Sequence, residues 1–374
     1  MSTPPADLPA TRQPPAYQPL RLSVLDVCPV PAGGSVRGAV DSSVELAQRV
    51  EGLGFERYWL AEHHNTQTIA SSVPSILIAH VAAATSTLRV GSGGVMLPNH
   101  APLHVAESFR LLEAMHPGRI DLGIGRAPGT DGRTALALRR TPAALRAENF
   151  PEELEDLLGF LTDGLDSDHP FASVTASPKG GDAPQIFLLG SSGYSAQLAA
   201  ALGLGFAFAA HINPTAAAAV LRHYRAEFRP SRFFAEPYSI LGLSALAGET
   251  DDEAEHHAAL LDLAWLHIGQ GGDRPSPTFE EALAYEYSPA EEAQRLANRA
   301  RHTIGSASNV AARLRVLADE AAVDEVMVLT MAHSAEVRAR SYELLAYELL
   351  AAEMLTPTTK GATTGAANSP AATG

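Results

Sequence analysis

Short apolar runs alternate with longer amphipathic stretches along most of this chain. The apolar runs are rich in leucine, β-branched and aromatic residues, which is typical of buried strands. They span residues 22–27, 55–61, 88–95, 119–125, 185–189, 205–210, 238–247 and 324–330. The stretches between them carry apolar residues at helical spacing, such as Val105, Phe109 and Leu112. This alternation predicts parallel strands joined by right-handed helical crossovers.

Eight strand–helix units without a strand-only region predict an α/β fold, a (β/α)8 TIM barrel with insertions after strands 4 and 7. A doubly wound open sheet is the alternative. We expect residues 21–355 to form a single barrel domain. The proline-rich residues 1–20 are expected to be a disordered arm, residues 356–374 a disordered tail, and 269–289 a loop.

Composition excludes several classes of function. The 374 residues are 46% apolar and 18% charged, as in an ordinary globular protein. The formal net charge of −15, without a cluster of Lys and Arg, makes nucleic acid a poor partner. Cys28 is the single cysteine and no HExxH motif occurs, so we expect no metal site. Without a targeting segment or an apolar run of membrane-spanning length, a cytoplasmic protein away from membranes is expected.

Polar residues follow the predicted strands, at the barrel end where active sites lie. They are Asp26, Glu62, His63, His64, Asn65, Arg126, Ser191, Ser192, His211, Asn213 and Thr330. Neighbouring side chains of an extended segment point to opposite faces, so one of the two adjacent histidines should face the barrel mouth. A histidine there could move a proton near neutral pH. The alternative is that both histidines are structural.

Glycines and serines mark two further places. One predicted strand contains three glycines, Gly91, Gly93 and Gly94. Glycines within a strand often mark a place where another backbone or a ligand approaches closely. The segment 190–194 (GSSGY) precedes a helix, whose free N–H groups could hold a phosphate. A simple serine N-cap is the alternative there. No GxGxxG fingerprint opens a strand–helix–strand unit, so we expect no dedicated nicotinamide site.

Five segments together resemble the bacterial luciferase-like flavin monooxygenases. They are WLAEHH (59–64), RVGSGGVMLP (89–98), VAESF (105–109), PGRIDLGIGRAPGTD (117–131) and LLGSSGYSAQLAA (188–200). The likeness covers about residues 21–350. The branch that it resembles includes tailoring oxygenases of natural-product pathways.

The resemblance implies a barrel that binds reduced FMN at its C-terminal mouth, with His63 as the catalytic residue. The cofactor-binding residues expected there are Asp26, Glu62, Gly93, Gly94, Gly125, Arg126, Gly190, Ser191, Ser192, Gly193 and Tyr194. The peptide between Gly93 and Gly94 falls where the family has a non-proline cis bond. Gly125 replaces a reactive cysteine of the luciferases, and Gly190 replaces an acidic residue of their phosphate-binding turn.

The function that follows from the resemblance is an FMN-dependent monooxygenase. It would use reduced FMN and O2, through a C4a-peroxyflavin, to oxygenate a small organic substrate. We expect a homodimer formed through helices within residues 74–116, fed by a separate NAD(P)H:flavin reductase. Loops at 130–184 and 248–305 would form the substrate pocket. The alternatives are an F420-dependent hydride-transfer oxidoreductase on the same fold and a non-catalytic flavin-binding protein.

Overall fold

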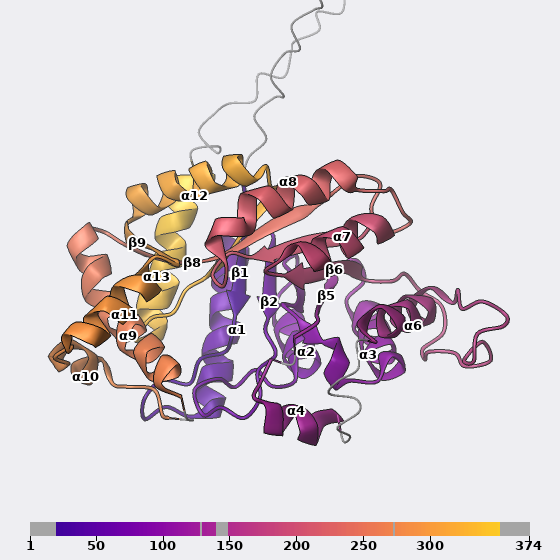
Figure 1. The fold of residues 1–374 in the computed structure, drawn as a ribbon, viewed down its shortest axis with the longest axis horizontal. Coiled ribbons are helices and arrows are strands. Elements are labelled where there is room, and N and C mark those ends of the chain that lie inside the picture. The colour runs from indigo at the N-terminus through magenta and orange to yellow at the C-terminus, as the bar shows by residue number, and fades with distance from the viewer. Residues whose placement is uncertain (1–19, 128, 140–148, 272–273, 352–374) are drawn as a thin grey trace, which may run out of the picture.

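The computed structural model describes residues 20–127, 129–139, 149–271 and 274–351 (Figure 1). The predicted N-terminal arm (except Leu20) and the predicted C-terminal tail lie outside the described residues. Within this described part, no helix is long and apolar enough to cross a membrane.

Eight parallel strands close into a barrel. They are β1 (Arg21–Asp26), β2 (Arg57–Leu60), β3 (Arg89–Ser92), β5 (Ile120–Gly125), β6 (Gln185–Gly190), β7 (Gly205–Ala209), β8 (Ser239–Gly248) and β10 (Glu325–Leu329). Each strand pairs with the next in this order, and β10 returns to pair with β1, where Glu325 lies opposite Arg21. The predicted (β/α)8 barrel is therefore confirmed, and the open sheet is wrong.

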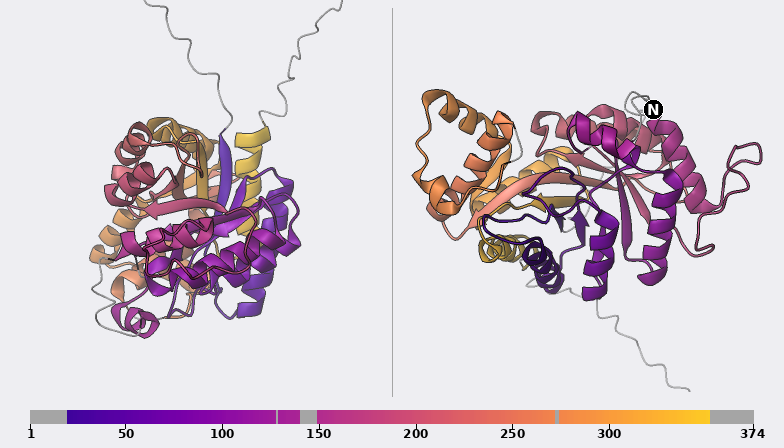
Figure 2. Two further views of the ribbon diagram at one scale, coloured as in Figure 1. Left: turned by 90° about the vertical axis from the view of Figure 1, so that its right-hand side faces the viewer. Right: turned by 90° about the horizontal axis from the view of Figure 1, so that it is seen from below.

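Helices cover the outside of the strands (Figures 1 and 2). They are α1 (Val36–Gly52), α2 (Pro74–Ala84), α3 (Pro102–Met115), α6 (Phe150–Thr162), α7 (Gly193–Leu202), α8 (Ala217–Glu227), α12 (Ala307–Ala321) and α13 (Ala335–Ala346). Shorter helical segments are α4 (Gly132–Arg139), η1 (Leu97–Asn99), η2 (Pro214–Ala216) and η3 (Tyr347–Ala351). Helix α1 begins after Ser35, whose hydroxyl accepts a hydrogen bond from the Gly38 amide and caps the helix.

Strand side chains alternate between two apolar cores, as the period of a strand requires. Leu22 and Val24 of β1 pack outward among the helices, in the same cluster as Tyr58. Leu25 packs inside the barrel with Trp59. The interior cluster also contains Phe187, Ile240 and Met327. We call the side that a residue takes in this alternation, inward or outward, its parity. Parity decides which strand-end residues point into the barrel mouth.

The predicted strand 88–95 is in fact two strands, β3 and β4 (Val95–Met96), separated at the Gly93–Gly94 peptide. That peptide is cis, as expected. A Cβ atom at Gly94 would lie 2.9 Å from the carbonyl oxygen of Gly123 on β5, and one at Gly91 would lie 2.5 Å from that of Asp121. The glycines therefore admit a neighbouring backbone, which is one of the two roles the sequence allowed.

The region after β8 differs most from expectation. Residues predicted as a loop contain helix α10 (Phe279–Ala284), which follows α9 (Asp251–Gln270) and precedes α11 (Pro289–Arg299) and strand β9 (His302–Ser306). Thr278 and Ser288 each begin a helix with a complete capping box, a signal that the sequence carries. We call residues 251–306 the arm. Its helices stand to one side of the strands (Figure 2, right).

Charged residues close the N-terminal end of the barrel. The Nε of Arg57 donates to both oxygens of Glu325 (2.9 Å each), and its Nη1 donates to Oδ2 of Asp121 (2.8 Å). Arg89 also donates to Asp121, through Nε at 2.9 Å. The Tyr238 hydroxyl bonds Glu325 at 2.7 Å. Every charge in this buried group has an opposite partner, which is the condition for burying charges at all.

Candidate active site

The first histidine after β2 points inward and the second points away. His63 continues the inward parity of Trp59, whereas His64 donates from Nε2 to Glu62 at 2.8 Å. Glu62 is fully buried and also accepts hydrogen bonds from the Met96 amide (2.9 Å) and His100 Nε2 (2.9 Å). Burial opposes ionisation of Glu62, but the hydrogen bonds from His100 and His64 outweigh it and lower its pKa. Glu62 thus binds the loops after β2 and β4 together and has no oxygen left over for a ligand.

His63 has a buried Nδ1 atom with no hydrogen-bond partner. Burial lowers its pKa below the usual 6.5, and the neighbouring His64 adds to this. His211, which follows β7, donates from Nδ1 to the carbonyl of Gly242 at 3.3 Å. Burial also lowers the pKa of His211, and His63 lowers it further. The mouth therefore contains neutral imidazoles at neutral pH.

Arg126 and Tyr194, which are far apart in sequence, meet at the mouth. The Arg126 guanidinium stands 4.4 Å from the centroid of the Tyr194 ring. Arg126 directly follows β5, and Tyr194 lies in the first turn of α7. Both side chains are exposed, so the cation is available to a ligand. The structure thus brings two predicted cofactor-binding residues together.

The first turn of α7 offers hydrogen-bond donors beside this pair. Ser192 is the N-cap residue, but its side chain makes no capping hydrogen bond. The adjacent carbonyl of Ser191 accepts a hydrogen bond from Asn213 (3.0 Å), which fixes the turn. A Cβ atom at Gly190 would lie 2.9 Å from Cβ of Ser195, so the packing of α7 against β6 requires a residue without a side chain there. The predicted alternative of a simple serine cap does not match this geometry.

Two predicted residues do not join this group. Asp26 has the outward parity of Val24 and accepts hydrogen bonds from Arg338 of α13 (2.5 Å) and the Cys28 amide (2.7 Å). Burial opposes ionisation of Asp26, but Arg338 together with the hydrogen bonds from Ser43, Tyr58 and the Cys28 amide lowers its pKa. Thr330 is buried and donates to the carbonyl of Ala245 (3.0 Å). Asp26 sits between barrel and helices and not in the mouth, because the strand places its side chain on the outer face.

Loops after β2 and β5 are bound to each other beside the mouth. Asn65 donates from Nδ2 to Oδ2 of Asp131 at 3.0 Å, and the Thr130 hydroxyl donates to the carbonyl of His64 at 3.2 Å. Asp131 also accepts from the Arg133 amide (2.9 Å). These bonds hold the segment that carries both histidines.

Sequence reasoning missed His302, the first residue of β9. Neither of its ring nitrogens, both buried, has a hydrogen-bond partner in the described part of the chain. The Trp265 ring of α9 packs against it, with 5.7 Å between the ring centroids. Burial lowers the pKa of His302 to about 4, and Arg299 adds to this effect. Recognising β9 from its alternating polar and β-branched residues would have placed this histidine at a strand start.

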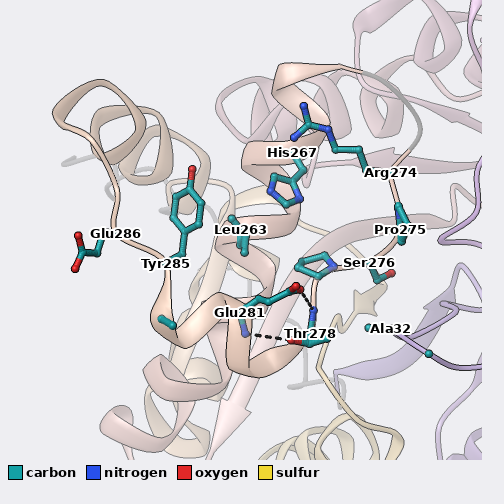
Figure 3. A pocket seen from close by; sticks show the side chains of 13 residues that line it. Ala32, Leu263, His267, Arg274, Pro275, Ser276, Thr278, Glu281, Tyr285 and Glu286 are labelled. Atoms are coloured by element: carbon teal, nitrogen blue, oxygen red, sulfur yellow. Dashed lines mark hydrogen bonds between the residues drawn. The ribbon is translucent and has the colours of Figure 1, made fainter.

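A cavity of about 880 Å³ lies between the arm and the loop after β1 (Figure 3). Its walls include Leu263 and His267 of α9, Arg274, Tyr285 and, across the gap, Ala32. The arm is held to the barrel on both sides of the cavity. Ser276 donates to the carbonyl of Val30 at 2.9 Å, and the Phe279 ring stacks on His333 with centroids 3.9 Å apart. Neither His63 nor Arg126 is among the residues that line this cavity.

Comparisons with known proteins agree with this geometry. A family model described as luciferase-like monooxygenase matches residues 21–325. A luciferase-like monooxygenase of Escherichia coli (strain K12) is 40% identical over 87% of this chain and 96% of its own length. N-acetyl-S-alkylcysteine monooxygenase of Bacillus subtilis (strain 168) is 34% identical over 87% and 97%. The solved structure of apo-MsnO8 is 38% identical, with a TM-score of 0.80 over 88% of this chain and 97% of that one.

Two more distant structures are similar in fold alone. One is the oxygenating constituent of 3,6-diketocamphane monooxygenase from Pseudomonas putida in complex with FMN, with a TM-score of 0.64 at 17% identity, covering 88% of this chain and 97% of that one. The other is an F420-dependent secondary alcohol dehydrogenase, with a TM-score of 0.62 at 12% identity, covering 88% and 99%. The family match extends over most of the barrel, and it carries the conclusion. This chain belongs to the luciferase-like monooxygenase family.

Proposed function

We propose that this protein is an FMN-dependent monooxygenase that uses reduced FMN and O2 to oxygenate a small organic substrate. The observation that carries the proposal is the arrangement of the mouth. An imidazole whose Nδ1 atom is buried and unpartnered and an exposed arginine at a helix N-terminus lie at the same end of one barrel. The family membership supports the same reaction class.

The residues at the mouth fit a flavin mononucleotide. The first turn of α7 would hold the single terminal phosphate, because its N–H groups and the Ser192 hydroxyl are donors and Arg126 supplies a positive charge. His63 would lie toward the ring system, where its unpartnered Nδ1 requires a hydrogen-bonding partner.

Reduced FMN, when bound, supplies the activation of O2, and the two oxygen atoms end in the product and in water. The chain supplies positioning and proton control. His63 is neutral at neutral pH because burial lowers its pKa, so its Nδ1 atom can donate or accept one proton. Trp59 and the interior apolar cluster exclude water from the barrel below it.

Two alternatives use the same mouth. An F420-dependent hydride-transfer enzyme is supported by a likeness of fold to the alcohol dehydrogenase. A non-catalytic flavin-binding protein would keep the phosphate site without the reaction. The absorbance spectrum of the cofactor that co-purifies or binds in titration separates FMN from F420. Oxygen uptake separates the enzyme from the binding protein.

We further propose that the enzyme works as a cytoplasmic homodimer. Helix α2 is apolar around most of its circumference, yet Ile76 is 66% exposed, and Leu111 and Met115 of α3 are each 53% exposed. An exposed apolar surface of this kind is typical of a subunit interface. Light scattering at micromolar concentration would give a dimer mass, and a monomer would contradict this part.

The reaction is tested with purified protein, FMN, NADPH and an added NAD(P)H:flavin reductase under 18O2. The probes are N-acetyl-S-benzylcysteine and acetophenone, a thioether and a ketone. Mass spectrometry should find one 18O atom in the product of at least one probe, and only when the reductase is present. Rapid bleaching of FMN by NADPH without reductase would contradict the two-component arrangement. Absence of 18O from both products together with failure to bind FMN would contradict the function.

A further inference from the structure

The orientation of His302 follows from strand register. Strands β8 and β9 are parallel, and His302 pairs with Ser244. On β8, Leu243 and Ala245 pack outward under the helices, whereas Ile240 packs inside the barrel. Ser244 has the parity of Ile240 and therefore faces inward. Residues in register in a parallel sheet have side chains on the same face, so His302 also faces the interior at the C-terminal end.

His302 as a whole is half-buried, but both of its ring nitrogens are buried, and neither has a hydrogen-bond partner among the described residues. Buried polar groups in folded proteins are almost always hydrogen-bonded, and each exception requires an explanation. Packing does not explain this one, because a phenyl ring would fill the same space against Trp265 without the unpaired nitrogens. His211, which also lowers the pKa of His302, has its own Nδ1 occupied by the carbonyl of Gly242. A ligand in the mouth would supply the missing partner.

The chemistry of that ligand follows from the charge state of the imidazole. Burial and the nearby Arg299 keep the pKa of His302 at about 4, so the ring is neutral at neutral pH. A neutral imidazole offers one donor and one acceptor. The nearby carboxylate, Asp262, is already bound by Arg299 through Nη2 at 2.8 Å and by Arg295 at 3.1 Å. Arg301 also lowers the pKa of His302, and its guanidinium stands 5.8 Å from the centroid of the Trp265 ring. The His302 ring itself is neutral, so a neutral hydroxyl or carbonyl group matches its one donor and one acceptor best.

We propose that His302 is a substrate-binding residue and that it hydrogen-bonds a neutral hydroxyl or carbonyl group of the organic substrate. This rests on the proposed function in one respect, since it takes the barrel mouth to be the place where the substrate binds. His302 belongs to the arm, outside the eight strands of the barrel. The arm would thereby select substrates, while His63, which follows β2, serves the reaction itself.

The test uses three probes of one size, namely toluene, benzyl alcohol and benzoate. Their dissociation constants are measured from ring 1H–15N signals of labelled histidine, with and without FMN. Wild type should bind benzyl alcohol about fivefold more tightly than toluene, the scale of one neutral hydrogen bond. His302→Phe should abolish that preference, and His302→Gln, which keeps a donor and an acceptor, should retain most of it. His223→Phe, a matched change on the exposed face of α8, should leave it unaltered.

Three results would overturn the proposal. They are equal binding of toluene and benzyl alcohol by wild type, an undiminished preference in His302→Phe, and tightest binding of benzoate. The FMN affinity of each variant is recorded in the same samples. If wild type fails to bind FMN, the proposed function fails, whereas the probe comparison without FMN still decides the role of His302.

Discussion

The two ends of this barrel treat buried polar groups in opposite ways. At the N-terminal end, Arg57 bonds Glu325 and Asp121 at 2.8–2.9 Å, and each of these groups has further partners. At the C-terminal end, the Nδ1 atom of His63 and both ring nitrogens of His302 are buried without one. The charges of the network at the N-terminal end are thus fully paired, whereas the unpaired nitrogens of His63 and His302 belong to neutral rings.

This difference separates stability from function along one axis. A charge can be buried only when it is paired, so the network at the N-terminal end holds the strand starts in register. A neutral imidazole is less costly to leave unpaired, and a ligand can complete its hydrogen bonding. The fold therefore provides a rigid N-terminal end, which we call the base. At the other end it provides a mouth whose polar groups lack hydrogen-bond partners until a ligand binds.

The largest effect on stability is expected at the N-terminal end of the barrel. Arg57→Ala would leave Glu325 buried without its guanidinium partner. It would also remove one of the two arginines that bind Asp121. We expect a loss of about 3–5 kcal/mol in the free energy of unfolding, measured by urea denaturation. Arg340→Ala breaks exposed ion pairs with Glu249 and Glu343 and should cost less than about 1 kcal/mol. Similar losses of unfolding free energy in the two variants would mean that the buried ion pairs at the N-terminal end stabilise the fold no more than exposed ones.

At the mouth, His63→Ala should act on the reaction and not on the fold. Product formation in the reductase-coupled assay should fall by about 10²-fold or more, the scale of general acid–base catalysis. The melting temperature should stay near that of wild type, because no hydrogen bond of the imidazole is lost. His223→Ala is the control on an exposed helix face. Unchanged product formation in His63→Ala would refute the assignment.

Arg126→Gln should weaken FMN binding about tenfold, because one charge-assisted hydrogen bond to the phosphate is lost. Riboflavin, which lacks the phosphate, should bind both proteins equally in a fluorescence titration. Arg313→Gln on the exposed face of α12 should change neither affinity. A parallel loss of riboflavin affinity would show that Arg126 acts on the ring or the fold and not on the phosphate.

The smallest effect concerns stability in acid. The pKa of His302 is about 4 in the folded protein and near 6.5 in the unfolded chain. The unfolded state therefore binds more protons between these values, and stability falls as the pH drops from 6.5 toward 4. In His302→Gln, the decrease in melting temperature between pH 7.5 and pH 5 should be about 1–2 °C smaller. An equal or steeper decrease in the variant would mean that His302 is not buried in its neutral form.

Much of the barrel could be predicted because each strand is a short apolar run followed by a helical pattern. The roles of strand-end residues were harder, because parity along the strand decides them. Asp26 is the last residue of β1 and Arg126 directly follows β5, but Asp26 points outward to Arg338. The arm was predicted poorly because its helices α10 and α11 are short and polar on most sides. His302 was missed with it, since its position depends on pairing with β8, a contact between distant residues.

The central claim is that ligand binding completes the mouth and leaves the base unchanged. Hydrogen–deuterium exchange of the protein with and without saturating FMN tests it directly, because one experiment reads both ends of each strand. We predict slower exchange in segments 62–66, 93–96, 125–127 and 190–196, with no change at 55–58, 119–121 and 324–326. Protection of the strand starts without protection of the mouth, or no protection at any segment under conditions where FMN binds, would contradict the account.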